Sequence, residues 1–225
     1  MSVSIVRKVL MALSGFFLLF FLLQHLAINM LSVISPAMFN ETSQFMGTNP
    51  LVQFLLQPVL IFGVLFHLGM GIYLEQQNRA ARPVKYAFNK PAANSTWMSR
   101  NMIITGIMIM LFLGLHMYDF WVHEMQVKYA GGDLSGLVGP SDPNSGYRYF
   151  PELVAKFQSP VRVGIYVLAF VFLSLHLLHG FQSAFQSVGF RHRKYTPSIQ
   201  KLGNIYAIAV PAGFVFIAVY HLING

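Results

Sequence analysis

The sequence predicts an all-α integral membrane protein with five transmembrane helices. The first observation is composition: 55% of the 225 residues are hydrophobic and only 10% are charged, whereas about a quarter of the residues of a soluble domain are charged. The second is that an apolar run of about 20 residues, the length that crosses a bilayer, recurs five times. The third is that Lys and Arg gather in alternate connections between these runs, which is typical of a multi-pass topology.

The five spans are expected at 9–34, 51–74, 102–121, 161–182 and 202–223, within one domain that covers 1–225. Pro58 and Pro211 fall inside spans and predict local kinks, which helices tolerate in a membrane. The segment 123–160 is the one long polar stretch, and its Gly, Ser and Pro residues predict an irregular outer cap. No internal repeat is evident.

The basic residues predict the orientation of the chain. Positively charged loops stay in the cytoplasm, and one side of the predicted bundle holds 11 of the 15 Lys and Arg residues. These are Arg7, Lys8, Arg79, Arg82, Lys85, Lys90, Arg100, Arg191, Arg193, Lys194 and Lys201. Six of the seven acidic residues lie on the other side. We therefore expect a cytoplasmic N-terminus and an external C-terminus, and no binding of nucleic acid. Attraction of anionic lipid and docking of a soluble partner both remain open as roles for the basic face.

Histidines inside the spans are the strongest functional signal. His25, His67, His116 and His176 fall one in each of the first four spans, where a polar side chain is costly and marks a functional site by default. An interhelical hydrogen bond would explain one of them, but four favour ligands. Because the chain has no cysteine, disulfides, thiolate-ligated iron–sulfur clusters and covalently attached haem are excluded.

The depth of these histidines predicts two pairs. Spans one and three run outward and place His25 and His116, here named the outer pair, in the outer half of the membrane. Spans two and four run inward and place His67 and His176, the inner pair, in the inner half. The two levels then differ by roughly 10–15 Å along the helices. Two b haems, each with an imidazole on either face, would use all four. Zinc fits less well, because a closed site needs about four converging ligands.

Other histidines carry weaker signals. His179 lies one turn after the inner-pair residue of its span and would contact a haem propionate, a quinone or the membrane interface. We expect His123 and His221 at membrane interfaces and His192 in solvent.

The glycines near the histidines have two possible explanations. Gly71 and Gly180 each follow an inner-pair histidine by four residues, and Gly63 precedes one. They would leave room for a porphyrin edge or allow close helix packing. Ser14, followed by a glycine, would suggest intramembrane proteolysis, but we expect no partner histidine at its depth.

Five stretches of sequence match known motifs. They are FLLQHLAINM around His25, AMFNETSQFMGTNP in the first outer loop, FHLGMGIY around His67, the single stretch from RNMIITG to LGLHMYDF that contains His116, and HLLHGFQSAFQSVG from His176 onward. With them the chain resembles the single-chain di-haem cytochrome b membrane anchors of bacterial succinate:menaquinone oxidoreductases and fumarate reductases. The motifs cover four spans and most loops, whereas the long outer loop and the fifth helix match less well.

The resemblance implies a four-helix antiparallel core that holds two b haems, plus one peripheral helix, in the bacterial cytoplasmic membrane. It assigns His67 and His176 to the haem proximal to an iron–sulfur subunit, and His25 and His116 to the distal haem. It implies partners docked on the cytoplasmic face: a flavoprotein subunit with FAD and a subunit with iron–sulfur clusters. The chain would pass their electrons to a quinone, menaquinone in this family, and would carry no succinate chemistry itself.

The quinone site is weakly specified. Quinone reduction consumes two protons, so we expect polar or titratable groups near a haem, and the candidates are Asn29, Glu41, Asp119, Arg162 and His179. Interfacial solvation or a contact with a haem propionate would explain each of them as well. Some fumarate reductases of this family carry a Glu two residues before the histidine of the fourth helix, where this chain has Ser174. The difference argues against that proton pathway and favours succinate oxidation.

Two alternatives stay open. The first is a di-haem cytochrome b anchor of another quinone-linked oxidoreductase, such as a hydrogenase or a formate dehydrogenase. The second is a haem-free transporter or small-molecule binding protein, in which the histidines only join helices. Inverted repeats or broken helices would favour a transporter, and the sequence indicates neither.

Overall fold

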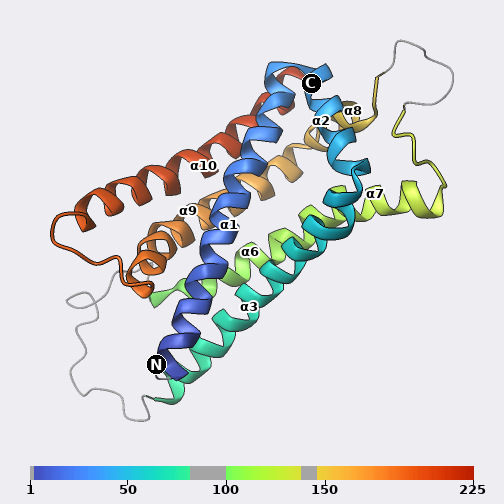
Figure 1. The fold of residues 1–225 in the computed structure, drawn as a ribbon. Helices are drawn as coiled ribbons and strands as arrows, with labels where there is room; N and C mark the ends of the chain where they lie inside the picture. The colour runs from blue at the N-terminus through green and yellow to red at the C-terminus, as the bar shows by residue number, and fades with distance from the viewer. Residues whose placement is uncertain (1–2, 82–99, 138–145) are drawn as a thin grey trace.

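The computed structural model describes residues 3–81, 100–137 and 146–225. Within these ranges five helices are long and apolar enough to cross a membrane, which confirms the predicted all-α class (Figure 1). Three of them are α1 (Val3–Ile34), α9 (Pro160–Ser187) and α10 (Thr196–Asn224). The second span joins the π-helical turn η1 (Val52–Leu56) to α3 (Gln57–Ala80). The third joins α6 (Met102–His116), η2 (Met117–Val122), α7 (His123–Met125) and η3 (Gln126–Ala130).

Two helices begin at the same local signal, a serine followed by proline. Ser35 precedes Pro36 at the start of α2 (Pro36–Thr48), and Ser159 precedes Pro160 at the start of α9. Each serine hydroxyl accepts a hydrogen bond from a backbone N–H of the first turn. Proline is favoured there because that turn has no carbonyl partner for its missing N–H. These two capped starts fix where α2 and α9 begin.

Four helices form a ring. α1 packs against α3 and α9, and α6 packs against α9 and α3, so that α1 lies diagonally opposite α6, and α3 opposite α9. α10 lies outside this ring along α9 and α1, as Figure 1 shows. Because each histidine of the outer pair is on one member of a diagonal, and each of the inner pair on a member of the other, both pairs meet across the middle of the ring.

Burial is concentrated away from the middle of the ring. The buried hydrophobic cluster comes from α2, α8 (Tyr149–Phe157), α9 and α10, and it comprises Phe39, Leu153, Phe157, Val163, Tyr166, Phe170, Val210, Phe214, Ile217 and Ala218. In contrast, α3 contains no fully buried residue. The fifth span is therefore the most tightly packed of the five, although it carries no histidine of either pair.

The segment 123–160 is less irregular than expected in its described part, and helices also occur in the first outer connection. The third span continues to Ala130, past the expected end at 121. The two outer connections, between spans one and two and between spans three and four, contain the helices α2 and α8, respectively. The apolar side chains of these short helices explain the difference, because Phe39 of α2 and Leu153 and Phe157 of α8 are buried against the bundle. Only part of the segment 123–160 is irregular.

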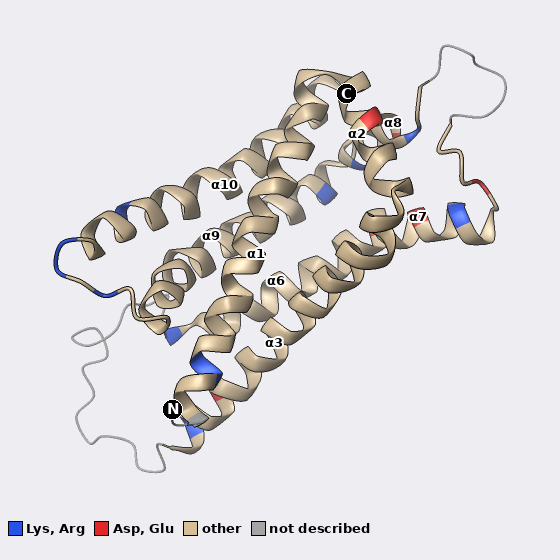
Figure 2. Cartoon of the chain, viewed as in Figure 1, with Lys and Arg blue, Asp and Glu red and all other residues tan. Residues whose placement is uncertain are grey.

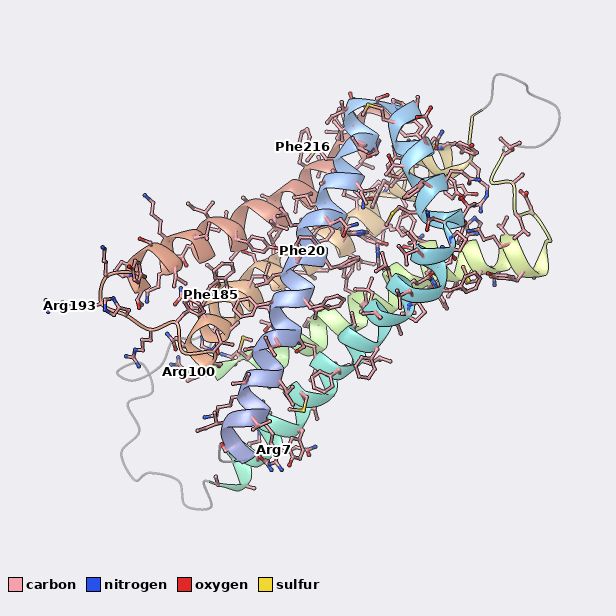
Figure 3. All side chains as sticks on the ribbon, in the orientation of Figure 1. Arg7, Phe20, Arg100, Phe185, Arg193 and Phe216 are labelled. Carbon is pink, nitrogen blue, oxygen red and sulfur yellow. The ribbon has the colours of Figure 1, made fainter. Side chains whose placement is uncertain are left out.

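Charged residues occupy the two ends of the bundle and leave its middle almost free of them (Figure 2). Arg7, Arg100 and Arg193 project from the end where the N-terminus lies, and Phe20 lies midway along α1 (Figure 3). The side chain of Phe20 is 71% exposed, as expected of a lipid-facing position. Of the basic residues used to predict orientation, Arg82, Lys85 and Lys90 lie outside the described residues. The direction in which the chain crosses the membrane stays a prediction.

A polar network closes the opposite end. Arg148 forms ion pairs with Glu124 and Glu152, and Lys128, which is only 4% exposed, pairs with Glu124 at 2.9 Å. Burial, and next the negative charge of Glu124, raises the pKa of the Tyr149 hydroxyl above its usual value. Tyr149 therefore stays protonated and donates to Gln44 Oε1 at 2.7 Å, which joins α8 to α2.

Candidate functional site

The inner pair lies between diagonally opposed helices. The rings of His67 on α3 and His176 on α9 have centroids 6.5 Å apart and planes at 67°. A hydroxyl of a neighbouring helix contacts each ring: Ser14 Oγ on α1 lies 2.9 Å from Nδ1 of His67, and Thr105 Oγ1 on α6 lies 3.1 Å from Nδ1 of His176. Among the described residues neither Nε2 has a hydrogen-bond partner, so Nε2 is the nitrogen that each ring presents to a ligand.

Small residues flank the inner pair on both sides. A Cβ atom on Gly15 would lie 3.7 Å from Cε1 of His67, and one on Gly106 would lie 3.8 Å from Cε1 of His176. Gly180 is close to the second ring as expected, since its Cβ would lie 3.9 Å from Cδ2. Gly63 has a different role, because a Cβ there would meet the ring of Phe17 at 2.6 Å. It allows α1 and α3 to approach each other closely.

The outer pair lies between the other two diagonal helices. The ring centroids of His25 on α1 and His116 on α6 are 5.7 Å apart, with planes at 88°. No hydroxyl of a described residue forms a hydrogen bond with these rings. Instead, aromatic rings of the same and neighbouring helices surround them: Phe21, Phe112, Phe120, Tyr166 and Phe214. Nδ1 of His116 is buried without a hydrogen-bond partner in the described part of the chain.

Two independent contacts give the separation between the pairs. The inner pair touches α1 at Ser14 and α6 at Thr105, and the outer-pair histidine of each helix, His25 or His116, lies eleven residues further on. Eleven residues of α-helix span about 16 Å. Both helices give the same value, so the two pairs occupy different levels, as the sequence predicts.

The pairs suit a metal that brings its own additional ligands. In the described ranges no group of three or more His, Asp or Glu side chains converges at one point. Two imidazole nitrogens that bind one metal ion at about 2 Å each hold their ring centroids roughly 6 Å apart. The observed 6.5 and 5.7 Å are close to this value. Haem iron, whose porphyrin supplies the other four nitrogens, needs only two such axial ligands. Nε2 of each inner-pair ring has no hydrogen bond to a described residue, and Nδ1 of His116 is buried without one; an imidazole nitrogen that carries no proton is a ligand of the required kind.

A buried ion pair lies one turn beyond the outer pair. Asp119 has a side chain with no exposed surface, and its two oxygens accept hydrogen bonds from Arg162 at 2.6 Å and from Tyr166 at 2.8 Å. Asp119 and Arg162 were both candidates from the sequence, and the fold pairs them with each other. Tyr166 was not a candidate. Since both carboxylate oxygens are engaged, the partly exposed guanidinium of Arg162 is the open end of this group.

The other candidates are scattered. Asn29 lies one turn after His25, where its amide donates to the backbone oxygen of His25 at 2.8 Å and lies 3.4 Å from Nδ1. Glu41 is exposed on α2, away from both pairs. His179 is partly buried on α9, without a hydrogen bond to a described residue.

The three remaining histidines, His123, His192 and His221, differ in their surroundings. His192 is exposed and His123 pairs with Glu152 at 3.2 Å at the C-terminal end. His221 is buried within the bundle: its side chain is 2% exposed, and Nε2 bonds Ser32 Oγ of α1 at 2.9 Å, whereas its position relative to the membrane interface stays a prediction. The packing of α10 on α1 buries it, which the polarity of the chain terminus does not indicate.

Two further expectations need correction. A histidine does lie at the depth of Ser14, namely His67. In addition, a short repeat exists: Ser14-Gly15 and Thr105-Gly106 are each followed by a histidine eleven residues after the hydroxyl residue. The spacing is visible in the sequence, but it has a meaning only once both hydroxyls are seen to touch imidazoles.

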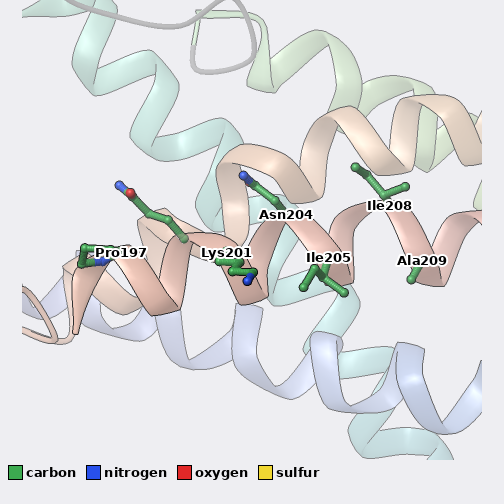
Figure 4. A pocket seen from close by; sticks show the side chains of 7 residues that line it. Pro197, Lys201, Asn204, Ile205, Ile208 and Ala209 are labelled. Atoms are coloured by element: carbon green, nitrogen blue, oxygen red, sulfur yellow. The ribbon is translucent and has the colours of Figure 1, made fainter. Parts of the chain in front are cut away.

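A groove of about 610 Å³ lies elsewhere, on the face of α10 (Figure 4). Its lining comes from this one helix: Pro197, Gln200, Lys201, Asn204, Ile205, Ile208 and Ala209. The isoleucines are more than half exposed, so the groove belongs to the lipid-facing surface and not to the site of paired imidazoles.

Comparisons with known proteins add no relative. No family model matches the chain, and neither the curated proteins nor the solved structures contain a match.

Proposed function

We propose that this chain is the di-haem cytochrome b membrane anchor of a succinate:quinone oxidoreductase. One observation carries the proposal: four imidazoles on four helices form two pairs across the bundle, at levels about 16 Å apart. The sequence motifs that resemble this family surround the same four histidines. The fold and the resemblance therefore support the same ligand assignment by separate routes.

In this proposal the chain holds, orients and insulates its cofactors. His67 and His176 would hold the haem proximal to the iron–sulfur subunit, and His25 and His116 would hold the distal one. When bound, the two haems would supply one-electron redox chemistry. The helices would supply the imidazole ligands and an apolar environment around them. Aromatic rings pack around the outer pair, and hydroxyls fix the inner pair.

The partners belong to the proposal as well. The end of the bundle that carries the N-terminus is basic (Figure 2), and Glu75 is the one acidic residue on that side. With this end in the bacterial cytoplasm, it would dock the iron–sulfur subunit, and through it the flavoprotein with its FAD. Succinate chemistry takes place on those subunits. The positive surface then serves both topology and docking.

The group Asp119, Arg162 and Tyr166 is the best candidate for contact with the quinone, which we propose to be menaquinone. It lies one turn beyond His116, and Arg162 has N–H groups that Asp119 does not occupy, with 30% of its side chain exposed. Such a donor suits a quinone oxygen or a haem propionate. Asn29, beside His25, is the second candidate at this level. Glu41 and His179 have no described contact that supports such a role.

The direction of the reaction rests on one position. Ser174 stands where some fumarate reductases carry a membrane-buried Glu, and no carboxylate lies in α9. Without that group a transmembrane proton pathway through this helix lacks its acid. We therefore propose succinate oxidation as the physiological direction.

Pyridine-haemochrome quantitation on the purified chain, together with whatever copurifies, tests the proposal. We expect two b haems per chain, reduced-minus-oxidised bands of b-type haem, and a flavin-containing partner reducible by succinate. A preparation with two b haems but a different redox partner would point to another quinone-linked oxidoreductase. A well-folded chain without haem would reject the proposal and favour a transporter or binding protein.

The contact between Ser14 and His67 raises a second candidate, an intramembrane serine protease. In a serine protease the base meets the serine through Nε2 and is oriented through Nδ1, whereas here Nδ1 meets the serine. The same contact recurs between Thr105 and His176, which a single catalytic dyad does not explain. We expect no labelling of Ser14 by a fluorophosphonate probe, and stoichiometric labelling would revive the candidate.

A further inference from the structure

We propose that Ser14 and Thr105 are positioning residues that fix the inner-pair imidazoles in the tautomer able to bind iron. The inference rests on the proposed haem-binding function and deepens it. It concerns residues that neither the histidine pattern nor the resemblance singles out. Both hydroxyls lie on the helices that carry the outer pair, and both touch histidines of the other two helices.

The direction of the hydrogen bonds follows from the hydroxyl groups. A hydroxyl has a single proton. Ser14 Oγ donates that proton to the backbone oxygen of Met11 at 2.8 Å, and Thr105 Oγ1 donates to that of Met102 at 3.0 Å. Each oxygen can then only accept from the imidazole. With the hydroxyl protons on the backbone oxygens, each inner-pair ring carries its own proton on Nδ1 and keeps its lone pair on Nε2; this is the tautomer that we propose.

This arrangement matters because a neutral imidazole carries one proton and only its bare nitrogen binds a metal. Histidines that bind metals commonly donate their other N–H to an oxygen, which fixes the tautomer and the ring orientation and raises the basicity of the ligand. The two hydroxyls supply the oxygen at each inner ring, and the outer pair has no equivalent.

The same arrangement of hydroxyl, glycine and histidine occurs on two helices, α1 and α6. Ser14-Gly15 and Thr105-Gly106 occupy equivalent places on α1 and α6, eleven residues before His25 and His116. In both, the glycine lies beside the imidazole, and a Cβ added to it would be 3.7 or 3.8 Å from Cε1, which is ordinary contact. Each of these helices thus supports one inner-pair ring with a hydroxyl and provides one outer-pair ligand itself.

The test replaces the hydroxyls one at a time in the full chain with its copurifying partners. Ser14→Ala and Thr105→Val remove the hydroxyl with little change in volume, and Ser14→Thr and Thr105→Ser retain it. Ser32→Ala is the matched control, because Ser32 lies on the same helix and bonds an imidazole, that of His221, at the same 2.9 Å. Haem content, the midpoint potential of each haem and its low-spin EPR signal are measured. Signals are assigned with His67→Ala and His25→Ala.

We expect the two hydroxyl-free variants to weaken retention of the inner haem roughly 10-fold or more. The fraction that stays bound should have a more positive midpoint potential, because a ligand that has lost its acceptor donates less charge to the iron. The outer haem, the hydroxyl-retaining variants and Ser32→Ala should match the parent protein.

Three results would overturn the positioning role: unchanged inner-haem signals in Ser14→Ala and Thr105→Val, equal changes at both haems, or loss of function in Thr105→Ser equal to that in Thr105→Val. A parent protein without haem would instead reject the proposed function. If Ser14→Ala fails to fold, the comparison of Thr105→Val with Thr105→Ser still decides the question.

Discussion

The inner and outer pairs use the same four-helix frame but hold their imidazoles in different ways. At the inner level a hydroxyl of the adjacent helix bonds each ring, and small residues lie against both rings. At the outer level the rings of His25 and His116 are packed among phenylalanines, and Nδ1 of His116 has no partner in the described part of the chain. Each ring of the inner pair thus has a hydroxyl contact, whereas the outer pair is surrounded mainly by aromatic rings and has one amide contact, from Asn29 to His25.

The difference teaches how two similar sites acquire different properties without different ligands. Hydrogen bonds to a ligand tune its basicity, whereas an apolar aromatic environment tunes the dielectric around the site. The outer level also has the Asp119–Arg162 ion pair, which places a buried charged group on one side only. We therefore expect the two levels to respond differently to substitution.

Replacement of the histidines has the largest expected effect. His67→Ala or His176→Ala should remove the inner haem, and His25→Ala or His116→Ala the outer one, because a single axial ligand holds haem poorly. Haem content, measured as pyridine haemochrome per chain, should fall from two to one in each variant. His221→Ala is the control, since His221 is buried but bonds Ser32 instead of a second imidazole. Any pair variant that keeps two haems would remove that residue from the ligand set.

Removal of the charge on Asp119 should have an intermediate effect that is specific to the outer level. Asp119→Asn leaves Arg162 without its counter-ion, and because Arg162 is 30% exposed we expect a loss of about 2 kcal/mol, below the roughly 3–5 kcal/mol of a fully buried pair. Glu75→Gln breaks a pair with Arg79 of the same 2.6 Å length but 73% and 34% exposed, and should cost less than about 0.5 kcal/mol. Thermal stability in detergent measures both losses. If Asp119→Asn and Glu75→Gln lose equal stability, burial does not determine how much each ion pair contributes.

The smallest expected effect concerns the spacing of the two helices that meet at the inner level. Gly63→Ala would place a Cβ 2.6 Å from the ring of Phe17. Since Phe17 is 38% exposed and can swing toward lipid, we expect a loss of only about 1 kcal/mol. Gly69→Ala, on the same helix with no atom within 4 Å, should be neutral or slightly stabilising because alanine favours helix. A stabilising Gly63→Ala would mean that α1 and α3 are not in close contact there.

Part of the site was accessible from the sequence. The hydropathy of the five runs and the single histidine in each of the first four predicted the spans, the two pairs and their different depths. These properties depend on local composition and on the fixed rise of a helix, which hold for any packing of the bundle. The outer connections were less accessible, since α2 and α8 are stabilised by the burial of Phe39, Leu153 and Phe157 against helices distant in the sequence.

By itself, the sequence determined the helices, their apolar character and the number and height of the imidazoles. Only the tertiary structure decided which side chains meet: Ser14 with His67, Thr105 with His176, Asp119 with Arg162 and Tyr166, and Ser32 with His221. The physical reason is that contacts between helices depend on the rotation of each helix about its axis and on the choice of neighbours. Those are set by packing over the whole bundle, and no local stretch of residues encodes them.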